Sequence, residues 1–360
     1  MPQVRVASFS ARVTGWQRKH GRHDLPWQNT RDAYRTWVSE IMLQQTQVAA
    51  VIGYYGRFLT RFPDVGTLAA SSEEEVMRHW AGLGYYSRAR NLHAAARIVV
   101  ADWGGVLPKT AEALETLPGI GRSTAAAIAV FSYGACAAIL DGNVKRVLAR
   151  HLGATGYPGE KKVEEWLWER ALALLPKSGI ESYTQGLMDL GATLCTRSRP
   201  DCAACPVRID CVAFVEGRTG ELPHRKPQKA VPQRACVMPV LLHAGEVLLE
   251  KRPSPGIWGG LWCLPQFADV DEARQALGLP ASVWRARQVL EPVEHGFTHF
   301  HLTIAPLLFG LSANAMRGLG ATGKPRGGRI WLPLAEVSTA ALPAPVKKLL
   351  RQLAETMPSR

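Results

Sequence analysis

Four cysteines lie close together in the stretch CTRSRPDCAACPVRIDC, which spans residues 195–211. The spacing C-x6-C-x2-C-x5-C places Cys195, Cys202, Cys205 and Cys211 on one short loop. Thiolates are soft ligands that select zinc, copper(I) or iron–sulfur clusters. Zinc ribbons more often bring two C-x2-C pairs together, whereas this loop has one. The ligand type and spacing therefore favour a [4Fe–4S] cluster over zinc.

A carboxylate in WVSEIMLQQTQV could act as a general acid. Glu40 shares a helical stripe with Trp37, Gln44 and Gln47, at positions i, i+3, i+7 and i+10. A solvated polar face would explain this stripe, but the apolar residues around it favour partial burial. Burial raises the pKa of a carboxyl group, so that it can hold the proton a general acid needs.

A second carboxylate, Asp141, stands just ahead of an expected helix in ILDGNVKRVLAR. A helix N-cap would by itself explain this position. The apolar run at 137–140 also indicates a buried helix start, where the helix dipole and N–H donors would keep the carboxylate charged. Such an anion could stabilise a developing cation, and capping and catalysis are compatible roles.

Two further stretches have features suited to nucleic acid. In LPGIGRSTAAAIAV, Gly119 and Gly121 can expose backbone N–H groups at a helix N-terminus, where a phosphate would bind. A lone G-x-G is a weak signal, but after a short helix and Leu-Pro it predicts a helix-hairpin-helix. In GLGYYSRARNL, Tyr85 and Tyr86 could stack on bases beside arginines, although packing against a glycine turn explains them equally well.

Helices are expected to position most of these residues. Short breaks containing Gly or Pro separate one helical pattern from the next over residues 1–216, which is typical of an all-α domain. The region 36–59 contains good helix formers and no proline, so we expect it to be helical. Other helical patterns cover 72–80, 89–103, 111–117, 124–132, 144–152, 160–175 and 182–194.

A chain of 360 residues exceeds the usual size of one core, so two domains are expected. Residues 217–233 are rich in proline and basic side chains and are interpreted as a linker. Residues 234–360 are predicted to be α+β. Its strands are expected at 236–242, 246–251 and 299–305, and its helices at 271–277 and 345–353. In the strand at 299–305, Phe300, Leu302 and Ile304 should share one face.

Composition indicates a cytoplasmic protein with a polyanionic partner. No stretch approaches the roughly 20 apolar residues of a membrane helix. The N-terminal MPQVRVASFSARV lacks the apolar run of a signal peptide, and the cysteine count of 7 is odd, which disfavours disulfides. A net charge of +13 favours nucleic acid, although a merely basic protein would show the same charge.

Together these pieces resemble the helix-hairpin-helix DNA glycosylases with an iron–sulfur loop, and most closely adenine DNA glycosylases of the MutY type. The resemblance covers essentially the whole chain and rests on several strings in order. They are LPW, SEIMLQQTQV, GLGYYSRARNLH, LPGIGRSTA, LDGNVKRVLAR, MDLGATLCTRSRP and the cysteine spacing. The implied protein is a monomer of the bacterial cytoplasm, associated with the nucleoid, that carries a [4Fe–4S] cluster.

The resemblance implies a reaction, the hydrolytic removal of adenine mispaired with 8-oxoguanine or guanine in duplex DNA. Glu40 would protonate adenine at N7 after the base is flipped out of the stack. Asp141 would stabilise the oxocarbenium-like sugar or capture it briefly before water attacks. Asn143 would help hold the Asp141 side of the site.

The resemblance also implies which residues bind the DNA. Trp27 and Gln185 would lie at the adenine pocket, with Gln185 at the amino edge of the base. Gln45, Thr46 and Tyr85 would fill the gap and contact the opposite, damaged base. The arginines between the cysteine ligands would meet a DNA phosphate, so the cluster would serve DNA binding and not base excision.

Ser123 decides the chemistry within the superfamily. Related bifunctional enzymes have a lysine at this position after the hairpin, and its amine attacks the sugar and cleaves the strand. A hydroxyl cannot form a Schiff base, so a monofunctional glycosylase is predicted. Lys145, one turn after Asp141, could still form an adventitious adduct with the abasic product.

The second domain resembles the Nudix-like domain of the same enzymes. The helix with which Nudix hydrolases bind magnesium is absent after Phe267, so the domain should recognise 8-oxoguanine and not hydrolyse nucleotides. The expected reader is Phe297, Thr298 and His299 in GFTHFHL, although a strand start with a core Phe would also explain this run.

Three rival functions stay open from the sequence. An endonuclease III-like glycosylase/lyase acting on oxidised pyrimidines shares the first domain, but Ser123 and the second domain count against it. A non-catalytic iron–sulfur DNA-binding protein would have no use for Glu40 and Asp141. A Nudix hydrolase with a helical appendage is disfavoured by the missing magnesium helix.

Overall fold

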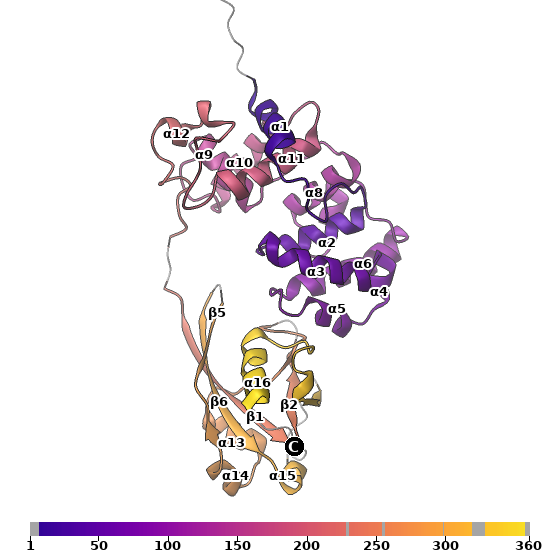
Figure 1. Cartoon of the computed structure of the whole chain (residues 1–360), viewed down its shortest axis with the longest axis vertical. Coiled ribbons are helices and arrows are strands. Elements are labelled where there is room, and N and C mark those ends of the chain that lie inside the picture. Colours follow the sequence, from indigo (N-terminus) through magenta and orange to yellow (C-terminus); the bar gives the residue numbers. More distant parts are fainter. Residues whose placement is uncertain (1–6, 228–229, 254–255, 298, 319–327, 357–360) are drawn as a thin grey trace, which may run out of the picture. The chain divides into compact units, whose positions relative to one another are not determined.

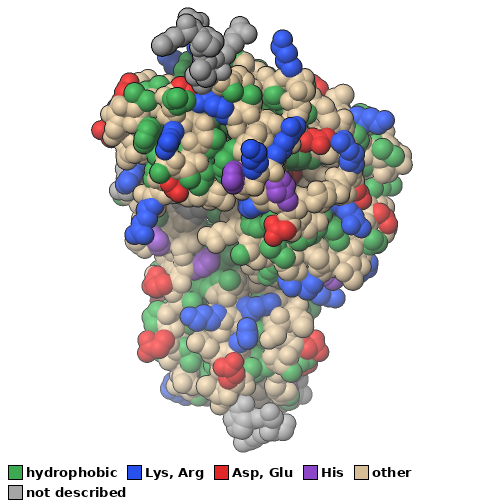
Figure 2. Space-filling view, turned by 45° about the horizontal axis from the view of Figure 1, so that its top comes forward, with side chains coloured by type: hydrophobic (Ala, Val, Ile, Leu, Met, Phe, Trp, Pro, Cys, Tyr) green, Lys and Arg blue, Asp and Glu red, His purple; other side chains and the backbone are tan. Residues whose placement is uncertain are grey.

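The computed structural model describes residues 7–227, 230–253, 256–297, 299–318 and 328–356. These form two compact units (Figure 1). One comprises Met1–Ala70 with Asn91–Gln228, and the other comprises Ser71–Arg90 with Lys229–Arg360. Among the described residues, no helix is both long enough and apolar enough to span a bilayer. Figure 2 shows Lys and Arg side chains scattered over the visible face among hydrophobic ones.

The first unit is all α, as predicted. It contains α1 (Phe9–His20), α2 (Ala33–Leu43), α3 (Val48–Arg61), α4 (Val65–Ala70), most of α6 (Ser87–Trp103), α7 (Ala111–Glu115), α8 (Arg122–Tyr133), α9 (Gly142–His151), α10 (Lys161–Ala173), α11 (Ile180–Asp189), the π-helix η1 (Leu190–Leu194), the 3-10 helix η2 (Arg208–Asp210) and α12 (Val212–Val215). Side chains from α1, α9 and α11, including Val13, Leu148 and Leu187, share one buried core. The predicted helices at 89–103 to 160–175 agree with α6 to α10 within two residues at each end.

The region 36–59, expected to be helical, is divided between two helices. The chain leaves the helix after Leu43 and restarts at Val48, and Gln45 between them has a φ of 57°. This left-handed conformation is unfavourable for a residue with a Cβ, so the break is imposed by the packing of α2 and α3 and not by local propensity. The polar stripe predicted through Gln44 and Gln47 therefore ends with α2.

The second unit is mixed α and β, as predicted. Its strands are β1 (Gln233–His243), β2 (Glu246–Lys251), β3 (Trp262–Cys263), β4 (Gln288–Val289), β5 (Val293–Gly296), β6 (His301–Gly310) and β7 (Arg329–Pro333). Its helical elements are α5 (Glu73–Trp80), α13 (Val270–Leu277), α14 (Ala281–Arg285), α15 (Ala313–Gly318), the 3-10 helix η3 (Leu334–Glu336) and α16 (Ala344–Thr356).

These strands form one sheet in the order β3-β2-β1-β6-β4, with β5 paired to β6 and β7 paired to β2. β1 and β6 are parallel, and the other pairs are antiparallel. β6 begins at His301, two residues after the predicted start, but Phe300, Leu302 and Ile304 are all buried as expected. A core of β1, β2 and β6 side chains packs on α13 and α14.

Candidate active site

Helix α2 places Glu40 at a cavity of about 590 Å³. Asp32 starts this helix by accepting the N–H groups of Tyr34 and Arg35, and Trp37 and Ile41 anchor its apolar face in the core. Glu40 is only partly exposed, and the surface it shows belongs to the cavity. Burial raises the pKa of Glu40 to about 8, and the nearby charge of Asp141 adds to this shift.

Asp141 caps α9 and lies close enough to Glu40 for its charge to act on that group. Its carboxylate accepts the backbone N–H of Val144 at 2.7 Å, as an N-cap should. Burial raises the pKa of Asp141, although the N–H groups of Val144 and Asn143 and the charges of Arg146 and Lys145 oppose the shift. The N–H donors expected from the sequence are present, and they favour the charged form of Asp141 against the effect of burial.

Side-chain hydrogen bonds hold both the loop before Asp141 and the helix after it. The hydroxyl of Ser123 accepts the backbone N–H of Leu140 at 3.0 Å, which fixes the residue preceding Asp141. Arg146 donates to the side-chain oxygen of Asn143 and to the backbone oxygen of Gly191, both at 2.7 Å. It also donates to the backbone oxygen of Cys195 at 2.8 Å.

Sequence reasoning missed Arg146, which joins Asn143 to the start of the cysteine loop. The contact depends on Gly191, because a Cβ there would lie 2.6 Å from the Cβ of Asn143. Gly191 belongs to the π-helix η1, an element that is frequent at functional sites. The family string LDGNVKRVLAR contains this arginine about one turn after the N-cap Asp141. That position was the signal in the sequence from which its role could have been predicted.

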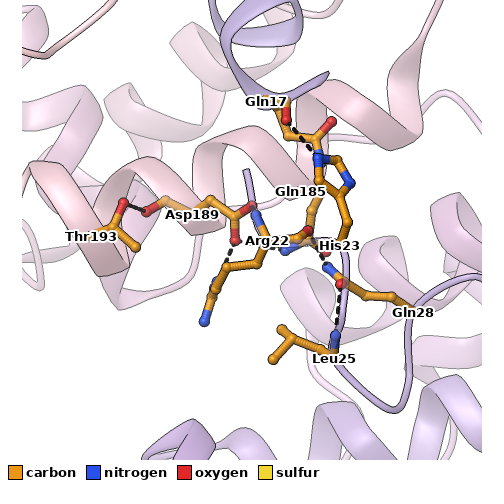
Figure 3. A network of polar contacts seen from close by, with 8 residues as sticks. All are labelled: Gln17, Arg22, His23, Leu25, Gln28, Gln185, Asp189 and Thr193. Atoms are coloured by element: carbon orange, nitrogen blue, oxygen red, sulfur yellow. Dashed lines mark hydrogen bonds and ion pairs between the residues drawn. The ribbon is translucent and has the colours of Figure 1, made fainter. Parts of the chain in front are cut away.

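The cavity of Glu40 also brings together two residues predicted to bind the base. Trp27 and Gln185 both line it, Trp27 from the loop after α1 and Gln185 from α11. Trp27 packs edge-on against Tyr55 with ring centroids 5.5 Å apart. Gln185 donates through Nε2 to Asp189, which is fully buried and paired with Arg22 (Figure 3). Sequence reasoning missed both Asp189 and Arg22.

The predicted hairpin is present between α7 and α8. Gly119 has a φ of 79°, and a Cβ at this position would lie 2.7 Å from the Cβ of Asn91. Gly119 is therefore required both by its conformation and by close packing. Gly121 is the N-cap of α8 and places no side chain over the helix start. This leaves the N–H groups of the first turn of α8 open to an anion.

The break between α2 and α3 carries Gln45 and Thr46. Gln45 is exposed and strained, whereas Thr46 is half-buried and its hydroxyl donates to the backbone oxygen of Gln44 at 3.3 Å. Strained exposed residues of this kind cluster at binding sites.

The four cysteines of the loop 195–211 line one small cavity together with Arg150. Arg150 donates to the sulfur of Cys195 at 3.4 Å and to the backbone oxygen of Thr196 at 2.7 Å. None of the seven cysteines, all of them described, is in a disulfide. Within the described residues, no group of three or more His, Cys, Asp or Glu side chains could hold a metal ion.

The remaining predicted residues lie in the second unit. Tyr85, Phe297 and His299 line one cavity of about 390 Å³ there. Tyr85 is exposed and has a φ of 48°, and Phe297 stacks on Phe300 with centroids 4.4 Å apart. The predicted reader Thr298 falls outside the described residues.

Comparison with known proteins covers both units. Residues 38–171 match the family model of HhH-GPD superfamily base excision DNA repair proteins, and residues 236–352 match the NUDIX domain. The chain is 36% identical to an adenine DNA glycosylase of Buchnera aphidicola subsp. Acyrthosiphon pisum (strain APS), over 95% of this chain and 96% of that protein. It is 36% identical to an adenine DNA glycosylase of Homo sapiens, over 96% of this chain and 74% of the human protein.

A solved structure of a thermostable thymine-DNA glycosylase matches 58% of this chain and 95% of that one, with 30% identity and a TM-score of 0.53. That match concerns the helical part of the chain. The matches to the two adenine DNA glycosylases extend through both units. The chain therefore belongs to the adenine DNA glycosylase family of base excision DNA repair enzymes.

Proposed function

We propose that the protein hydrolyses the N-glycosidic bond of adenine placed opposite 8-oxoguanine or guanine in double-stranded DNA. The observation that carries this proposal is the burial of one carboxyl group, Glu40, at a cavity and close to the charge of a second, Asp141. A group with a pKa of about 8 is largely protonated at neutral pH and can donate its proton to a leaving base.

The two carboxylates would divide the reaction between them. Glu40 donates its proton to adenine N7, which draws electrons out of the glycosidic bond and makes the base a neutral leaving group. Asp141, capped by backbone N–H groups and beside Arg146, provides negative charge for the cationic sugar. Water then adds to the sugar carbon and releases a proton, which restores the acid form of Glu40, and the products are adenine and an abasic site.

Strand cleavage is not part of the proposed reaction. The Ser123 hydroxyl accepts a backbone hydrogen bond and cannot form a Schiff base. Lys145, one turn after Asp141, forms an ion pair with Glu164 at 2.7 Å, which engages its amine in a contact outside the proposed reaction. We expect abasic product whose strand breaks only after treatment with alkali.

A glycosylase assay on matched duplexes tests the proposed function. Duplexes with adenine opposite 8-oxoguanine, guanine or thymine, and one with thymine glycol opposite adenine, are incubated with the protein and analysed with and without alkali. Adenine release from the first two is expected. Release of thymine glycol with spontaneous strand breaks would instead identify a glycosylase/lyase, and binding without any release would identify a non-catalytic protein.

The rate of adenine release should decline at alkaline pH. The acid form of Glu40 is the reactive one, so the rate should fall about tenfold per pH unit above a pKa of about 8. Single-turnover rates from about pH 6 to about pH 10, with duplex binding measured at each pH, would show this limb. A flat profile with intact binding would contradict the assignment of Glu40 as the acid.

The cysteine loop is proposed to hold a [4Fe–4S] cluster through Cys195, Cys202, Cys205 and Cys211. Four thiolates on a cluster bind four iron atoms and stand farther apart than the four ligands of one zinc ion. The four cysteines share one small cavity, and cysteine thiolates are the ligands that hold iron–sulfur clusters. The cluster would order the loop, and exposed arginines such as Arg197 and Arg208 would then meet DNA phosphates.

Replacing one ligand should separate folding and binding from chemistry. Cys202→Ser is expected to lose the iron–sulfur absorption at about 400 nm, to lower the melting temperature and to weaken duplex binding. The exposed Cys136 supplies the matched control, because Cys136→Ser should change none of these. If Cys202→Ser retained its absorption and its DNA affinity, the cluster assignment would be wrong.

The second unit is proposed to recognise the damaged base. Phe297 and His299 line a cavity with Tyr85, and aromatic side chains of this kind stack on bases. We propose in addition that the protein acts as a monomer in a reducing bacterial cytoplasm, on nucleoid DNA. Its unpaired cysteines and its net charge of +13 support that location.

A further inference from the structure

One buried carboxylate controls the amide of Gln185. Asp189 is fully buried and accepts three hydrogen bonds (Figure 3). Its Oδ2 accepts the backbone N–H of Arg22 at 2.9 Å. Its Oδ1 accepts Nε of Arg22 at 2.7 Å and Nε2 of Gln185 at 2.9 Å. The guanidinium of Arg22 supplies the opposite charge that a buried carboxylate needs.

An ionised carboxylate can only accept hydrogen bonds. The amide of Gln185 must therefore turn its Nε2 toward Asp189, one helical turn away on α11. A glutamine amide has its oxygen on the side opposite its nitrogen, so Oε1 is presented away from Asp189. Because Gln185 lines the cavity that also contains Glu40, the group offered to a bound base is a hydrogen-bond acceptor.

The surrounding chain holds this arrangement in place. Gly21 allows the end of α1 to approach Asp189, since a Cβ there would lie 2.9 Å from Oδ2 and 2.6 Å from the backbone oxygen of Gln17. Gln28 donates to the backbone oxygen of Arg22 at 3.0 Å. The contacts of Gly21 and Gln28 therefore hold the loop that carries Arg22 in place. The two groups of Arg22 that donate to Asp189 are held with it.

We propose that Asp189 is a positioning residue that sets base selectivity: by locking the amide of Gln185, it selects a purine with an amino group at C6 over one with an oxygen there. Adenine offers an N–H donor at that edge, whereas hypoxanthine offers a carbonyl oxygen. Two acceptors facing one another leave both without a partner, and a site built this way rejects the analogue. This inference rests on the proposed function, because it takes Gln185 to contact the adenine edge.

The test compares excision of adenine and hypoxanthine placed opposite the same 8-oxoguanine. In Asp189→Asn, an amide nitrogen in place of Oδ1 gives up the bond from Nε of Arg22 and can donate to Oε1 of Gln185, so the Gln185 amide can turn over and offer Nε2 to the base. The ratio of single-turnover rates for adenine and hypoxanthine should fall at least about tenfold. A ratio is independent of the fraction of active protein, so partial loss of folding does not obscure it.

Two further variants complete the experiment. Gln185→Met leaves the pair of Asp189 and Arg22 intact and removes the amide, so it should also lower the ratio, and adding Asp189→Asn to it should have no further effect. Thr193→Val removes a hydrogen bond to the backbone oxygen of Asp189 but none to its carboxylate, so the ratio should stay at the wild-type value.

The outcomes distinguish this inference from the function it rests on. If the wild-type protein releases adenine but Asp189→Asn keeps the ratio, the inference alone is overturned. If Asp189→Asn does not fold, an unchanged ratio in Gln185→Met would overturn it equally. If the wild-type protein releases no adenine from any duplex, the proposed function fails first.

Discussion

Replacing Glu40 by glutamine is expected to lower the rate of adenine release by about 10²- to 10⁴-fold while the protein still folds and binds duplex DNA. Glutamine matches the size of the protonated side chain but has no proton to donate to N7. The loss should therefore fall on the chemical step, in single-turnover rates measured with enzyme in excess of DNA.

The stability of this variant should depend on pH in a defined direction. Burial raises the pKa of Glu40 from 4.5 to about 8, so the folded protein holds a proton that the unfolded chain releases. The contribution of Glu40 to stability is therefore complete below about pH 4.5 and is lost as the pH rises through 8. Glu40→Gln has no carboxyl group to ionise, so it does not lose stability in this way as the pH rises. Its melting temperature should therefore exceed that of the wild type most clearly at alkaline pH.

Glu181 offers a matched control within the same cavity. Its side chain is 42% exposed and pairs with Arg31, so Glu181→Gln makes the same chemical change without touching a buried acid. Excision should stay within a few fold of the wild-type rate, since exposed ion pairs contribute little. Undiminished adenine release by Glu40→Gln would remove Glu40 from the mechanism.

The two carboxylates were predictable because their signals are local. Glu40 stands among apolar residues on one helix, and Asp141 stands before a helix after an apolar run, so neither prediction needs a distant contact. Asp189 and Arg22 are 167 residues apart in sequence, and nothing near either one indicates the other. A buried ion pair of this kind appears only once α1 and α11 are packed together.

The fold shows the same division between local and distant causes. Helices with clear starts, such as those begun by Thr110 and Asp141, were placed within two residues. The break at Gln45 was missed because a left-handed conformation at a residue with a Cβ has no signal in local helix propensity. The strands β3 and β4 have two residues each, too few to show an alternating pattern, and are defined only by their partners β2 and β6.

Replacing Asp141 by asparagine is expected to lower the rate of adenine release by about 10²- to 10³-fold, because it removes the negative charge that stabilises the cationic sugar. Asparagine is as good an N-cap as aspartate, so it can still accept the N–H of Val144 and α9 should keep its start. Asp141→Asn also removes the unfavourable burial of a charge, which offsets the lost attraction to the nearby charges of Arg146 and Lys145.

Alanine at the same position separates capping from catalysis. Asp141→Ala should lose both the charge and the cap, and so lose about 1 kcal/mol of stability in addition to activity. Asp141→Asn should lose activity alone, with an unfolding midpoint in urea close to that of the wild type. The two variants should therefore release adenine equally slowly and unfold differently. If Asp141→Asn kept the wild-type rate and only Asp141→Ala were impaired, Asp141 would act solely as a cap and the charge needed by the sugar would have to come from elsewhere in the site.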